Sequence, residues 1–168
     1  TMNAGEVGNS GSISLRTGTS NDGSSGSIHL ETRAASGGGG GQITLAVGVG
    51  NRGSGGNVVL QAGTVESQSG ISGGSVIMRA GNALDLNGKN SAGEGGNIAI
   101  AGGSGTGTGG SIQVKSGSSE ASMSGSVVLS SADSDGNQGS GSIRVATGAS
   151  NDASGSITMN TGVANSGP

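Results

Sequence analysis

The sequence predicts an all-β fold, a β-solenoid of about ten 15-residue glycine-rich strand repeats, with two strands per coil favoured over one. Three observations predict it. An eight-residue pattern that begins with Gly recurs ten times, mostly at spacings of 14 to 16 residues. Apolar and polar residues alternate inside each copy, and Gly, Ser, Asn and Asp fill the segments between copies. A fixed period of this kind indicates a repeat architecture, in which each unit buries its apolar face against its neighbours.

Each copy is expected to form one half-buried strand. The first copy reads Gly-Ser-Ile-Ser-Leu-Arg-Thr-Gly, and we number its residues as positions one to eight. Side chains alternate across a strand, so positions three, five and seven share one face and positions two, four and six share the other. The ten copies span 11–18, 26–33, 41–48, 56–63, 74–81, 96–103, 110–117, 125–132, 141–148 and 155–162.

The expected core consists of positions three and five. Position three is Ile or Val in all ten copies, and position five is Leu, Met, Ile or Val. This alternation with polar residues is typical of a strand with one buried face. The predicted structural core is therefore Ile13, Leu15, Ile28, Leu30, Ile43, Leu45, Val58, Leu60, Val76, Met78, Ile98, Ile100, Ile112, Val114, Val127, Leu129, Ile143, Val145, Ile157 and Met159.

The linkers between copies are predicted to be turns. Clusters such as 19–25 consist of Gly, Ser, Asn, Asp and Thr, and Gly there allows positive φ and a close approach of neighbouring arcs. Two linkers, 63–73 and 81–95, are longer than the others. Insertions in a repeat protein often emerge on one face, which is sometimes the binding face.

The sequence predicts where the strands lie along the chain, but it says less about how they are arranged in space. Basic residues on the outward face occur only in odd-numbered copies, at Arg16, Arg79, Lys115 and Arg144, which suggests a unit of two copies. Two strands per coil would place apolar faces opposite each other at about 10 Å, whereas one strand per coil would pack them against a Gly/Ser arm. Handedness, and parallel stacking against an antiparallel meander, stay open.

The whole chain, 1–168, is expected to be a single repetitive segment. Residues 1–5 resemble 158–162 in the tenth copy, so the chain begins in the middle of a repeat. We expect it to be part of a longer repetitive protein or of a continuous fibre.

Composition excludes several classes of protein. The chain has 40 Gly, no aromatic residue and 29% apolar residues, too few for an ordinary globular core. There is no Cys, and the net charge of −3 comes from charges scattered singly, so no basic patch predicts nucleic acid as a partner. No stretch in this segment predicts membrane insertion.

No constellation of residues predicts catalysis, so we expect no enzyme and no cofactor. His29 is the only His and occupies an outward position, where it is expected to be solvated. The segment 48–53 matches G-x-G-x-x-G, but no helix follows and a turn is the better interpretation. The weak calcium candidate is Asp133, Asp135 and Asn137, three oxygen-bearing side chains at alternating positions with no Glu to complete the loop.

The repeated motif Gly-(Ser/Asn)-(Ile/Val)-x-(Leu/Val)-x-(Thr/Ala/Ser)-Gly resembles the strand repeats of Gly-rich β-solenoid surface and fibre proteins, of the filamentous adhesin or fibre-shaft type. The resemblance implies an extracellular or cell- or particle-surface location and a structural role, with no functional residues to carry over. It covers nearly the whole chain.

The function expected first is a structural component of an extracellular filament or fibre shaft that associates with itself or with neighbouring repeats. The alternative is an adhesin that presents the loops 63–73 and 81–95, with a surface glycan as an open partner. An ice-binding solenoid is less favoured, because Thr44 and Thr158 are the only outward threonines in the copies and charged residues interrupt them.

Overall fold

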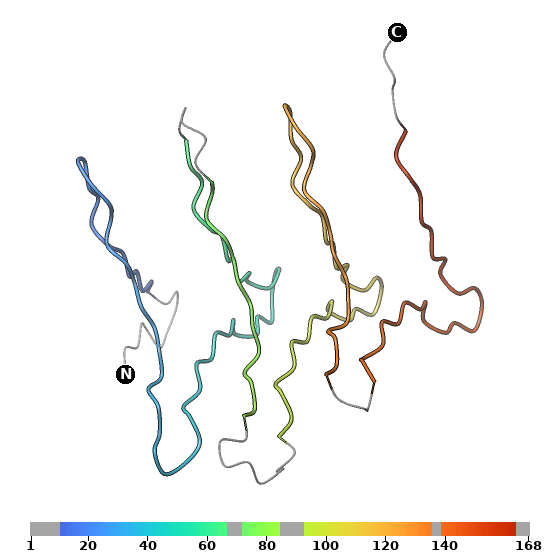
Figure 1. The fold of residues 1–168 in the computed structure, drawn as a ribbon, viewed down its shortest axis with the longest axis horizontal. Coiled ribbons are helices and arrows are strands. Elements are labelled where there is room, and N and C mark those ends of the chain that lie inside the picture. Colours follow the sequence, from blue (N-terminus) through green and yellow to red (C-terminus); the bar gives the residue numbers. More distant parts are fainter. Residues whose placement is uncertain (1–10, 67–71, 85–92, 136–138, 164–168) are drawn as a thin grey trace. The chain divides into compact units, whose positions relative to one another are not determined.

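A computed structural model describes residues 11–66, 72–84, 93–135 and 139–163. These residues contain no helix and no strand, and Figure 1 draws them without a coil or an arrow. The prediction of an all-β fold, and of a β-solenoid with two strands per coil, is therefore wrong for the described chain. The ten copies are extended segments that are not joined into sheets.

Missing backbone hydrogen bonds explain this correction. Among the described residues, four hydrogen bonds join one backbone group to another, and each lies at a linker rather than along a copy. A strand requires a ladder of such bonds to a neighbour. The alternation of apolar and polar residues is present, but no neighbouring segment of the same chain supplies the ladder.

The chain divides into two compact units, Thr1–Arg79 and Ala80–Pro168. The first unit contains four complete copies and most of the fifth, and the second contains the other five copies. The same local pattern of copy, linker and copy recurs in both. Each unit is described below by itself.

Bends in the chain fall within linkers. In the first unit they lie at 21–23, 36–38 and 51–53, and in the second at 106–107, 120–122, 135 and 151–152. Asn, Asp, Ser and Gly at these places favour turns because their side chains bond to nearby backbone or tolerate unusual φ. Two such bonds are present, from the amide of Ser122 to Oγ of Ser119 (3.0 Å) and from the amide of Asp152 to Oγ of Ser150 (3.2 Å).

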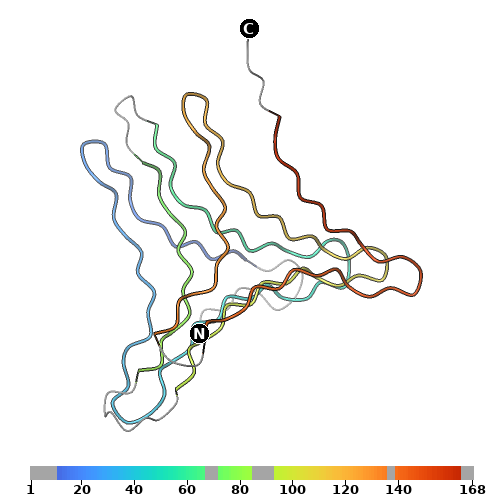
Figure 2. The same ribbon diagram turned by 45° about the vertical axis from the view of Figure 1, so that its right-hand side comes forward.

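Consecutive copies leave and enter a linker as the two sides of a hairpin-like arm. Figures 1 and 2 show the chain doubling back near residue 20, in blue, within the first unit. The second unit has a comparable arm near residue 120, in orange. Where the structure describes the linkers that were predicted to be turns, it has bends.

A backbone hydrogen bond closes the base of four linkers. The amide at position one of a copy donates to the carbonyl at position eight of the copy before it, with N···O distances of 2.8–2.9 Å. The four linkers that are closed in this way contain between six and fourteen residues. Closure is therefore independent of linker length. The bonds run from Gly74 to Gly63, Gly96 to Gly81, Gly110 to Gly103 and Gly125 to Gly117.

The chain forms no buried core over the residues that the structure describes. All twenty residues of the expected core are exposed, with fractions between 49% and 91%. The order within a copy is constant, because position three is less exposed than position five in every copy. A single chain thus leaves its apolar positions accessible.

Candidate functional site

The apolar positions form the feature that is most regular along the chain. We call positions one, three, five and seven of the ten copies the odd face, and positions two, four, six and eight the even face. The odd face contains Gly at position one, the apolar pair at three and five, and a small residue or Val at seven. It holds no charged residue in any copy. Burying this face would therefore remove no charge from water, which is the costly part of burying a surface.

The structure retains a difference between the two faces. Three copies carry Val or Ile at position four as well, on the even face. In the fourth copy Val59 is 77% exposed, whereas its neighbours Val58 and Leu60 are 53% and 69% exposed. The same order holds around Ile77 and Val128 in their copies. The odd face is consequently the less exposed side of these three copies, although it is not buried.

Position one lies against the end of the preceding copy. A Cβ placed on Gly56 would lie 2.8 Å from Cγ1 of Val47, and one on Gly41 would lie 3.1 Å from Cβ of Thr32. Thr32 also donates its hydroxyl hydrogen to the carbonyl of Gly41 at 3.2 Å. Every later copy shows an approach of this kind, within 4 Å of position seven or eight of the copy before it. The opening glycines concerned are Gly26, Gly41, Gly56, Gly74, Gly96, Gly110, Gly125, Gly141 and Gly155.

Space, and not backbone conformation, explains glycine at position one of five copies. Among the described glycines a positive φ occurs at Gly53 (75°) and Gly139 (79°), and both lie in linkers. The opening glycines have none of this strain, yet a side chain on several of them would meet the preceding copy. These glycines permit the close approach of two copies at the base of the linker between them.

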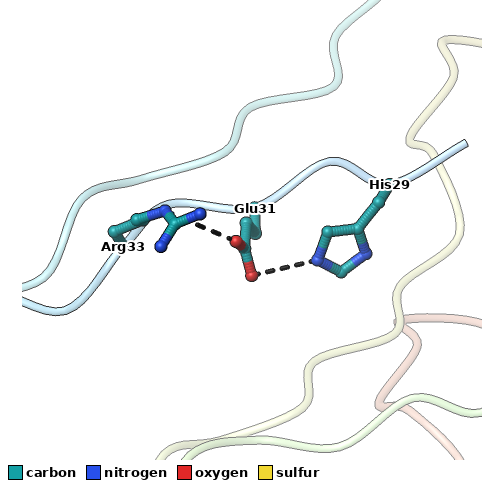
Figure 3. A network of polar contacts seen from close by, with 3 residues as sticks. All are labelled: His29, Glu31 and Arg33. Carbon is teal, nitrogen blue, oxygen red and sulfur yellow. Dashed lines mark hydrogen bonds and ion pairs between the residues drawn. The ribbon is translucent and has the colours of Figure 1, made fainter.

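A polar cluster lies on the even face of the second copy. His29, Glu31 and Arg33 occupy positions four, six and eight, and Figure 3 shows them side by side. Nε2 of His29 lies 3.0 Å from Oε2 of Glu31, so the Nε2–H form of the ring donates this hydrogen bond. Nε of Arg33 lies 3.7 Å from Oε1 of Glu31. Because all three side chains are well exposed, this contact contributes little to stability.

The described residues do not assemble the weak calcium candidate. Asp133 and Asp135 are exposed residues at the start of a linker, and Asn137 lies outside the described residues. No group of three or more His, Cys, Asp or Glu within the described ranges is placed to hold a metal ion. The motif at 48–53 includes the bend at 51–53, which ends in Gly53 with positive φ.

The two long linkers lie partly outside the description, at 67–71 and 85–92. Their bases are closed by the bonds from Gly74 to Gly63 and from Gly96 to Gly81. The short linkers before Gly110 and Gly125 are closed in the same way. The closing hydrogen bond is therefore not a feature that marks the long linkers as a binding site.

Basic and acidic residues are separated between the copies and the linkers. The copies contain five of the seven basic residues and one of the ten acidic residues, while the linkers contain eight acidic and two basic residues. All five basic residues are on the even face: four at position four or six of odd-numbered copies, and Arg33 at position eight of the second copy. Each copy is thus apolar on one face and neutral or basic on the other, except at Glu31, and its linkers are mainly acidic. This separation of basic copies from acidic linkers is present in the sequence alone, in the position of each charge relative to the repeat.

Comparisons with protein-family models, with curated proteins and with solved structures found no match. Within the ranges that the structure describes, there is no helix with the length and apolar character needed to cross a membrane.

Proposed function

We propose that this chain is a structural component of an extracellular filament or fibre shaft, in which copies of the repeat join neighbouring copies. The observation that carries the proposal is the odd face, ten uncharged apolar segments at nearly constant spacing that remain accessible in the single chain. Uniform repeats with accessible apolar faces extend by association, because every unit needs neighbours to cover it.

Two further observations support a structural role over a binding role. The linkers differ in length and sequence, but the contact between position one and the preceding copy recurs throughout. Variation in length is thus confined to the parts that connect copies. The mainly acidic linkers would also keep an assembly hydrated, since charge away from zero favours solubility. The extracellular location is proposed from the likeness of the motif to surface and fibre repeats.

Electron microscopy of the purified chain at neutral pH tests the proposal. We expect unbranched filaments of uniform width that lengthen with protein concentration. Discrete particles of constant size across the same concentrations would contradict a filament and would move attention to the linkers as binding elements.

A further inference from the structure

We infer that the odd face is the surface through which one copy of this chain binds a second copy of itself. This inference rests on the proposed structural function and names the partner and the contact. The single chain buries neither position three nor position five in the part that the structure describes.

The exposed area is large enough for a partner. The chain exposes 17041 Å² of accessible surface. A folded monomer of 15.5 kDa is expected to expose about 7,200 Å², and the fully unfolded chain about 22,500 Å². The difference from the folded value is about 10,000 Å², whereas a stable interface buries about 1,200–2,000 Å² in total. The area that is available exceeds what a stable dimer needs several-fold.

The chemistry of the two faces selects which face is covered. Two odd faces can meet without removing a charge from water, because no odd position is charged in any copy. Two even faces would bring basic residues such as Arg16 and Arg79 towards each other. Association through the odd face thus avoids both a desolvated charge and a like-charge contact.

The spacing of the apolar pairs selects a second copy as the partner. Most pairs follow one another at 14 to 16 residues, with two longer intervals before Gly74 and Gly96. A partner that covers pair after pair must carry apolar groups at the same intervals. A second copy of this chain carries them, including the two longer intervals, while a partner without the repeat would match one pair and miss the next.

Matched aspartate variants test the surface. Leu60→Asp with Leu129→Asp introduces charge at position five of two copies, and Val59→Asp with Val128→Asp introduces the same charge one residue away on the even face. The paired positions are similarly exposed in the single chain, 69% and 74% against 77% and 79%, so neither variant disturbs a buried site. The dissociation constant of each full chain is measured by sedimentation equilibrium.

We expect the position-five variant to raise the dissociation constant about a hundred-fold or more, because it places unpaired charge in the interface. The position-four variant should stay within about three-fold of the unaltered chain, since exposed substitutions have small effects. Equal weakening by both variants would overturn the inference. An unaltered chain that remains monomeric, or that binds phosphatidylcholine vesicles in preference to itself, would overturn it as well.

The outcomes separate this inference from the proposed function. Filaments that form equally well with the position-five variant would retain the structural function and reject the odd face as its contact. Dimers that weaken as expected, but never lengthen into filaments, would retain the odd face and reject the fibre.

Discussion

The two ends of a copy differ although both are usually glycine. A Cβ on any described closing glycine, at position eight, would meet nothing within 4 Å, as at Gly48 and Gly103. A Cβ on an opening glycine of the second to tenth copies would lie within 4 Å of the copy before it, as at Gly56 and Gly110. At Gly41, Gly56, Gly74, Gly96 and Gly110 the Cβ would lie within 3.4 Å of the preceding copy, so packing at the base of the linker explains glycine at these opening positions. Packing does not explain glycine at position eight.

The sequence already reflects this difference. Position one is Gly in all ten copies, whereas position eight is Arg33 in the second copy and Ala132 in the eighth. The composition alone would assign all these glycines to flexible turns. The structure instead separates glycines that permit a contact from glycines that do not.

The largest effect is expected where a side chain would meet backbone, since backbone cannot rotate away. A Cβ on Gly102 would lie 2.5 Å from the carbonyl oxygen of Gly110, while one on its neighbour Gly103 would meet nothing within 4 Å. Gly102→Ala should break the 2.8 Å bond from the Gly110 amide to the Gly103 carbonyl. We expect amide exchange of Gly110, measured by NMR, to accelerate roughly ten-fold, the upper range for one exposed hydrogen bond.

Gly103→Ala is the matched control and should leave that exchange rate unchanged. If amide exchange of Gly110 accelerated equally in both variants, the closing bond would depend on the backbone flexibility of glycine and not on the space that glycine leaves.

A smaller effect is expected where the obstacle is a side chain. A Cβ on Gly56 would meet Cγ1 of Val47 at 2.8 Å, and a methyl group can be removed by a second substitution. Gly56→Ala should shift the NMR resonances of Val47, and Gly56→Ala combined with Val47→Ala should restore the resonances of the surrounding residues. Failure of the double variant to restore them would mean that the opening glycine is required for its backbone freedom.

The smallest effect is expected from lengthening a linker. Four closing bonds have nearly the same length around linkers of six to fourteen residues. Inserting Gly-Ser-Gly-Ser after Gly105 would cost about 0.5 kcal/mol in loop closure. The exchange rate of the Gly110 amide should rise no more than about two- to three-fold, and an increase as large as that of Gly102→Ala would contradict closure that is independent of length.

The sequence predicted the division into copies and linkers well. Asn21, Asp22 and Gly23 predicted the bend at 21–23. These features are local, because turn chemistry and side-chain alternation depend on neighbours in the chain.

The predicted strands and coils failed for a reason that is not local. Alternation at Ile13 and Leu15 shows which side of a segment would be buried, but a strand also needs a partner for its backbone. The described single chain supplies one closing bond at some linkers and no ladder along the copies. The role of position one was also only partly anticipated, since the value of Gly56 depends on Val47 nine residues earlier. The cluster of His29, Glu31 and Arg33 follows from their alternate spacing on an extended chain.

The central claim is that association covers the odd face and leaves the even face accessible. Because the chain has no Cys, a single introduced thiol reports on one position. Leu60→Cys and Val59→Cys place that thiol on the odd and even faces of the same copy, both exposed in the single chain. The measurement is the rate of maleimide labelling as protein concentration rises through the range of assembly. We predict that labelling at position 60 slows while labelling at position 59 does not, and equal rates at all concentrations would contradict the account.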